Sequence, residues 1–263
     1  MSSFISRIVV AVVLLPVVLG AAYLGGWWMF ALISLAGLLA LHEFWLLARE
    51  HAPLALAGYA GVALALVGAE LSGFQWMVGG VLVTLPLAFS LKLVSRARQA
   101  STAAVSTTVL GAAWIGLGLA FLVLLRAVPD KGRLLLFTVL IAVWAGDTLA
   151  YLGGRLLGRH KMAPSTSPGK TWEGFVFGTA ATVFVAFVAL YKQHYLTIGQ
   201  SIVLGVVLAV AAPLGDLFES LMKRDAGVKD SGRLLGGHGG MLDRLDAFLF
   251  AAPAAYFAIL ALT

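Results

Sequence analysis

Charged residues are scarce in this chain of 263 residues, and cysteine is absent. Only 11% of the residues are charged, whereas soluble domains carry about 25%. Apolar residues make up 61% of the chain, so we expect an integral membrane protein. Without cysteine the chain has neither disulfides nor thiolate-bound metals. The net charge of +6 is typical of basic loops at a membrane surface, and we expect no nucleic-acid partner.

Two familiar binding motifs are incomplete. The stretch "PGKT" ends like a nucleotide-binding P-loop, but the glycine required five residues before Gly169 is Pro164. The stretch "HEF" at 42–44 is followed by Leu46 where a zinc protease needs a second histidine. There is also no internal repeat or linker. We therefore treat 1–263 as a single membrane domain, with a mainly hydrophobic scaffold at 1–130 and a catalytic part at 140–250.

Nine apolar runs are long enough to cross a bilayer, which takes about 20 residues of helix. We predict an all-α, polytopic membrane protein whose spans are 5–24, 27–48, 53–71, 74–94, 104–126, 134–153, 173–191, 198–221 and 244–262. Another span follows the first run almost at once, so we interpret the first as a retained helix rather than a signal peptide. With the N-terminus inside, the basic residues left on the outer side are Arg126, Lys131, Arg133 and Lys192. The positive-inside rule favours this orientation.

Acidic residues are concentrated in the C-terminal half, where two polar loops, 153–172 and 222–243, are predicted on the inner side. Asp147 lies well inside a predicted span, and Asp216 and Glu219 lie one turn apart near the end of another. An ionisable group in a spanning helix costs about 2.5–3.5 kcal/mol at the helix centre and usually marks a site. The structural alternatives are pairing with an arginine of a neighbouring helix and extension of the side chain to the membrane interface.

Asp243 and Asp246 are spaced i, i+3, which places both carboxylates on one helix face at the inner surface. Complementing the helix dipole is one explanation. It does not account for the same spacing at Asp216 and Glu219. Two acidic helix ends joined by a cationic loop form a nest for a hard cation, and magnesium prefers few carboxylates together with substrate phosphates.

The loop between these helix ends is rich in glycine and carries four cations, which are Lys223, Arg224, Lys229 and Arg233. Such cations beside carboxylates suit a phosphate-bearing substrate, although an ordinary positive-inside loop would also contain them. His238 is a candidate metal or phosphate ligand, or a residue that hydrogen-bonds within its loop. In the other inner loop, Ser167 and Thr171 either bind phosphate or ribose or cap the following helix.

These residues indicate a metal-assisted phosphate site on the cytoplasmic side. The same features also fit a cation-coupled transporter of an anionic solute. A transporter would be expected to carry polar residues near the midplane in both halves. Here the first half has little beyond His42, Glu43 and Glu70.

The run "SLMKRDAGVKDSGRLLGGHGGMLDRLD" from Ser220 to Asp246 resembles the signature of the phosphatidate cytidylyltransferases, or CDP-diacylglycerol synthases. The stretches "GDTLAYLGGRLLGRHK", "SPGKTWEG" and "PLGDLFES" are similar to that family as well, so the resemblance covers about 140–250. One departure is Gly169, where many members carry a second lysine; Lys170 is in place.

The resemblance implies transfer of the cytidylyl group of CTP to phosphatidate, with magnesium as cofactor, in phospholipid biosynthesis at the cytoplasmic (inner) membrane. An alcohol phosphotransferase or a lipid kinase, which would keep the substrates but change the bond made, stays an alternative. The resemblance also implies metal ligands at Asp216, Asp243 and Asp246. It further implies phosphate contacts from Lys170, Lys223, Arg224 and Lys229. Asp147 and Glu219 would orient a lysine or a metal-bound water. Small-residue segments such as "AGLLA" and "GAAWIGLG" would mediate a homodimer, or only packing within the chain.

Overall fold

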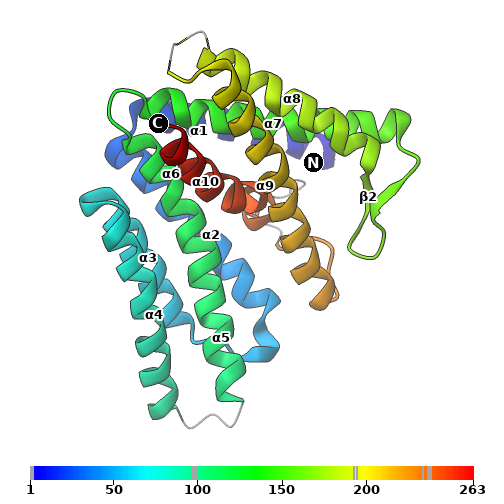
Figure 1. Ribbon diagram of the computed structural model, residues 1–263. Coiled ribbons are helices and arrows are strands. Elements are labelled where there is room, and N and C mark those ends of the chain that lie inside the picture. Colours follow the sequence, from blue (N-terminus) through cyan, green and yellow to red (C-terminus); the bar gives the residue numbers. More distant parts are fainter. Residues whose placement is uncertain (1–2, 96–99, 192, 194, 233, 236–238) are drawn as a thin grey trace. The chain divides into compact units, whose positions relative to one another are not determined.

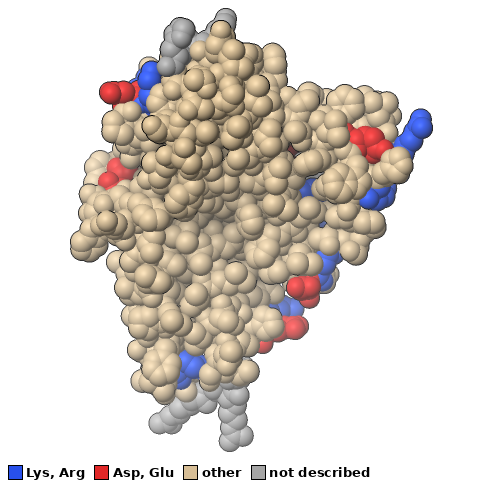
Figure 2. All heavy atoms as spheres, viewed as in Figure 1, with Lys and Arg blue, Asp and Glu red and all other residues tan. Residues whose placement is uncertain are grey.

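The computed structural model describes residues 3–95, 100–191, 193, 195–232, 234–235 and 239–263 (Figure 1). In this part of the chain, eight helices are long and apolar enough to cross a membrane, and a shorter apolar helical segment covers Val12–Leu24. The prediction of an all-α, polytopic membrane protein is therefore confirmed. Large apolar side chains such as Trp28, Leu56 and Phe89 are exposed, as expected of a surface that faces lipid. The view in Figure 2 shows a broad central area without charged side chains, which lie toward its margins.

The elements follow one another along the chain with short connections. They are α1 (Ser3–Leu24), α2 (Gly26–Leu47), η1 (Arg49–His51), α3 (Ala55–Ser72), α4 (Phe74–Val94), α5 (Ser101–Gly111), η2 (Ala112–Leu117), α6 (Gly118–Ala127), α7 (Gly132–Leu157), β1 (Lys161–Ala163), β2 (Ser167–Thr171), α8 (Trp172–Tyr191), α9 (Ile198–Asp225) and α10 (Leu242–Leu262). The helix from 101 to 127 is continuous, because η2 is a stretch of π-helix between α5 and α6.

The chain divides into two compact units. Residues 1–128 and 225–245 form unit 1, and residues 129–224 and 246–263 form unit 2. The loop 225–245 groups with residues 1–128. The single membrane domain, with its scaffold at 1–130 and its catalytic part at 140–250, stays a prediction beside this division.

Unit 1 is held together by close contacts between helices that carry small residues. A Cβ atom built at Gly80 of α4 would lie 2.4 Å from the backbone nitrogen of Ala65 in α3, so only glycine allows this approach. The π-helical stretch is buried, and Trp114 packs edge-on against Phe44 of α2. The segments "AGLLA" and "GAAWIGLG" thus contribute to packing within unit 1, and the homodimer stays a prediction.

Unit 2 is built on α7 and α8, which run side by side (Figure 1). Gly174 of α8 lies against the Ala150 carbonyl of α7, and the Thr182 hydroxyl donates a hydrogen bond to the Ala142 carbonyl at 3.2 Å. Between the two helices the chain forms the hairpin β1–β2, in which Lys161 pairs with Thr171. We expected only a polar loop there.

Candidate active site

Lys170, at the end of the hairpin, reaches the helix α9 and pairs with Asp216. Its Nζ lies 2.9 Å from Asp216 Oδ2 and 3.3 Å from the carbonyl oxygen of Pro213, to which it donates a hydrogen bond. The second carboxylate oxygen of Asp216 accepts a hydrogen bond from the Ser220 hydroxyl, 3.3 Å away. The exposed fractions of the Lys170 and Asp216 side chains are 21% and 37%, so the pair is accessible to a ligand.

Asp246 lies next to this pair because α9 and α10 approach each other closely within unit 2. A Cβ atom at Gly215 would lie 2.3 Å from the backbone oxygen of Asp246, so a side chain at position 215 would push the two helices apart. One carboxylate oxygen of Asp246 accepts a hydrogen bond from Ala247 N at 2.8 Å. The carboxylate interacts electrostatically with Asp216, Lys223 and Asp147. Unit 2 therefore collects acidic and basic groups of several helices in one place.

The last turn of α9 adds two further cations. Lys223 forms an ion pair with the fully buried Glu219, one turn earlier on the same helix. Arg224 donates a hydrogen bond from Nε to the carbonyl oxygen of Thr166, in the turn of the hairpin, at 3.1 Å. The hairpin is thus attached to α9 by Lys170 at one end and by Arg224 at its turn. This arrangement fixes where both cations lie.

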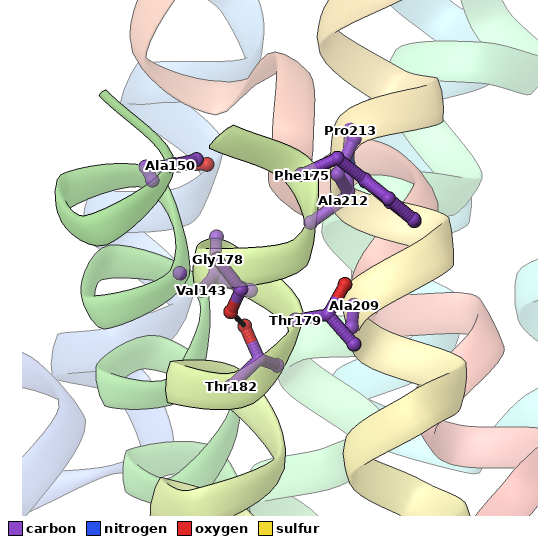
Figure 3. Close-up of a pocket in the computed structure, with 11 residues that line it drawn as sticks. Val143, Ala150, Phe175, Gly178, Thr179, Thr182, Ala209, Ala212 and Pro213 are labelled. Atoms are coloured by element: carbon purple, nitrogen blue, oxygen red, sulfur yellow. Dashed lines mark hydrogen bonds between the residues drawn. The ribbon is translucent and has the colours of Figure 1, made fainter. Parts of the chain in front are cut away.

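Asp147 lines a small cavity of about 30 Å³ formed by α7, α8 and α9 (Figure 3). It interacts electrostatically with Asp216 and Lys170. The opposite wall contains Pro213, whose missing N–H leaves the carbonyl of Ala209 without its usual helical partner. The hydroxyl of Thr179, also in the wall, has no hydrogen-bond partner among the described residues. This volume is sufficient for a water molecule that would contact these polar groups.

Asp243, in unit 1, organises the loop before α10. Its Oδ2 accepts hydrogen bonds from Gly240 N at 2.7 Å and from both N and Oγ of Ser231 at 3.0 Å. Gly239 adopts a φ of +82°, which favours glycine and lets the chain turn into the helix. The loop therefore fixes the position of the Asp243 carboxylate, three residues before Asp246 on α10.

The residues present fit a magnesium ion by their chemistry. Asp216, Asp243 and Asp246 supply hard carboxylate oxygens, and magnesium typically takes one or two of these together with water and substrate phosphates. Within the described ranges, no three His, Asp or Glu side chains are grouped closely enough to bind one metal ion by themselves. A site of this kind would take its remaining ligands from the substrate.

The remaining predicted site residues have varied surroundings. Thr171 is buried, and its hydroxyl accepts a hydrogen bond from Gly174 N at 3.1 Å, so it caps α8, one of the two roles considered. Ser167 lies in β2, opposite Ala163. Lys229 is exposed in the loop before α10. Two predicted substrate contacts, Arg233 and His238, lie outside the described residues.

Sequence reasoning missed Glu43 and Ser231. Glu43 is buried near the end of α2, and its carboxylate accepts hydrogen bonds from the loop that contains Ser231. The cost of burying a carboxylate, which singled out Asp147, applies equally to Glu43 and is the signal that could have found it. Its partners are 188 or more residues away, so no local pattern indicates them.

Residues 5–262 match the sequence model of a family described as the cytidylyltransferase family. A phosphatidate cytidylyltransferase of Mycobacterium bovis is 38% identical over 250 residues, which cover 87% of this chain and 79% of that protein. One of Haemophilus influenzae is 44% identical over 130 residues, or 48% of this chain and 45% of that protein. One of Staphylococcus haemolyticus is 43% identical over 142 residues, or 54% of each. The chain thus spans about half the length of two of these relatives.

Proposed function

Because the chain belongs to the cytidylyltransferase family, we propose that it transfers the cytidylyl group of CTP to phosphatidate. The products are CDP-diacylglycerol and pyrophosphate, and the reaction is assisted by magnesium. The observation that carries the proposal is the group formed by Lys170, Asp216 and Asp246 in unit 2. It combines carboxylates suited to a hard cation with a partly exposed ammonium suited to a phosphate.

The reaction needs positioned charges more than a general base. A phosphate oxygen of phosphatidate attacks the α-phosphorus of CTP, the bond from that phosphorus to the bridging oxygen breaks, and pyrophosphate leaves with the electron pair. The phosphatidate phosphate is largely ionised at neutral pH and is already a nucleophile. The barrier comes from bringing two polyanions together and from the charge on the leaving group. Fixed cations that contact the phosphates lower this barrier.

The chain's own residues meet these needs in distinct ways. Lys170 is held by Asp216 and the Pro213 carbonyl, so its ammonium is directed before a substrate arrives. Lys223 is held in the same manner by Glu219. Asp216 and Asp246, which interact within unit 2, would hold the magnesium ion, which when bound offsets phosphate charge as a Lewis acid. The role of Asp243 as a further ligand is implied by the family resemblance. Arg224 and Lys229 supply further positive charge toward the triphosphate or the lipid phosphate.

The membrane setting fits a reaction between a soluble and a lipid substrate. Most basic residues fall on the side of the N-terminus, which supports an active site and an N-terminus on the cytoplasmic face of the inner membrane. CTP would arrive from the cytosol, and the phosphatidate would enter from the bilayer. A homodimer would form through the small-residue segments "AGLLA" and "GAAWIGLG".

CTP labelled at different phosphates distinguishes cytidylyl transfer from the alternative reactions. Purified full-length protein in mixed micelles of detergent and phosphatidate is given magnesium and CTP labelled at either the α- or the γ-phosphate. The proposal predicts that the α-label enters the lipid fraction and the γ-label appears only in pyrophosphate. Transfer of the γ-label to lipid would instead identify a lipid kinase. If neither label reaches lipid while the folded protein moves an anionic solute across liposomes in response to a cation gradient, the chain is a transporter.

A further inference from the structure

Glu43 connects the N-terminal scaffold to the loop that precedes α10. It lies in the last turn of α2, and 4% of its surface is exposed. Its Oε1 accepts a hydrogen bond from Met241 N at 3.0 Å, and its Oε2 accepts one from Leu242 N at 2.8 Å. Ser231 Oγ lies 2.9 Å from Oε2 and 3.0 Å from Asp243 Oδ2, so the single hydroxyl proton is shared between the two carboxylates. All of these residues belong to unit 1.

These contacts cap the start of α10 from another helix. The first N–H groups of a helix have no partner within it, and a negative charge there is favourable. The helix α10 begins at Leu242, and the carboxylate of Glu43 bonds the N–H of that residue and of the one before it. Glu43 therefore helps to hold the first residues of α10 in place.

Two glycines of the loop make room for this carboxylate. A Cβ atom at Gly232 would lie 2.4 Å from Glu43 Oε1, and one at Gly240 would lie 2.3 Å from Glu43 Oε2. Ser231 contacts both Glu43 and Asp243, so the two carboxylates are joined through one hydroxyl. The loop is thus shaped around Glu43 as well as around Asp243.

Stability alone does not account for a buried carboxylate at this position. Removing a carboxylate from water is costly, and an apolar residue of similar size often stabilises a protein as well or better. We propose that Glu43 is a positioning residue, which holds Ser231 and the first turn of α10 so that Asp243 is placed for magnesium and CTP. This inference rests on the proposed function, and it adds a residue of α2 to those that act on Asp243.

The test replaces Glu43 with glutamine, which keeps the size but loses the charge and one acceptor oxygen. The matched control is Glu50→Gln, because Glu50 is exposed in η1, just after the same helix. In Glu43→Gln we expect the turnover rate to fall at least about tenfold and the magnesium concentration for half-maximal rate to rise. Hydrogen exchange of the free protein supplies a second readout, and amides of 239–243 should exchange faster. The control should match the wild type in each measurement.

A purely structural role would give a different pattern. It would lower the thermal stability and the active fraction but leave the magnesium requirement of the remaining activity unchanged, and that result would overturn the proposal. Unaltered exchange at 239–243 with full activity would also overturn it. If Glu43→Gln does not fold, Ser231→Ala provides the second variant, since it removes the shared hydroxyl and should shift the magnesium requirement in the same direction. An inactive but folded wild type would refute the proposed function instead.

Discussion

Replacing Asp246 with asparagine is expected to reduce the rate of CDP-diacylglycerol formation at least about a hundredfold, which corresponds to about 2.7 kcal/mol of activation free energy. Asparagine has nearly the same shape and keeps an oxygen that can accept the hydrogen bond from Ala247. It loses the negative charge that a magnesium ion requires beside Asp216. The loss should therefore appear in turnover, with little change in the thermal unfolding temperature.

The control for this variant is Asp130→Asn, because Asp130 is exposed in the connection between α6 and α7. Lipid product is measured over a range of magnesium concentrations for the wild type and for both variants. We expect the control to retain the wild-type rate. If folded Asp246→Asn protein forms lipid product at a rate within threefold of the wild-type rate, Asp246 is not a metal ligand.

Replacing Lys170 with methionine is expected to lower kcat/KM for CTP by about a hundredfold, the usual effect of removing one donor that stabilises developing negative charge. Methionine has a similar length and reach but no charge. Asp216 and the Pro213 carbonyl already orient the ammonium of Lys170. Binding a phosphate therefore costs little additional side-chain entropy. Lys170→Arg should keep part of the activity, since it keeps the charge but not the geometry.

The matched control is Lys161→Met, on the other strand of the same hairpin, where the side chain is exposed. Steady-state kinetics at saturating phosphatidate separate an effect on CTP from an effect on the lipid. Equal losses in Lys161→Met and Lys170→Met would mean that the hairpin acts only through its overall positive charge. A loss confined to phosphatidate would place Lys170 at the lipid phosphate.

The helices could be predicted from the sequence because each apolar run is long enough to span a bilayer and is bounded by glycine, proline or charge. The hairpin could not, since its strands have only three and five residues and lie in a stretch with Pro164 and Gly169. Such a stretch has no alternation of apolar and polar residues that would indicate a strand.

The sequence singled out Asp147 and Asp216 because burial of a charge in a spanning helix has a large cost, and Asp243 and Asp246 because of their i, i+3 spacing. Asp216 and Asp246 interact within unit 2, and their role as metal ligands stays a prediction. The pairing of Lys170 with Asp216 joins residues 46 positions apart, and the contacts of Glu43 join residues still further apart. Contacts between residues so far apart in the sequence depend on how the helices pack. Local sequence patterns do not contain that information.

The most direct test of the account measures CDP-diacylglycerol and pyrophosphate formed by the purified full-length protein from CTP and phosphatidate in mixed micelles. The protein is assayed with magnesium, after removal of magnesium by a chelator, and after magnesium is restored. The account predicts equal amounts of the two products, loss of both with the chelator, and recovery with magnesium. Folded protein that forms no lipid product under these conditions, or that forms it undiminished in the chelator, would contradict the account.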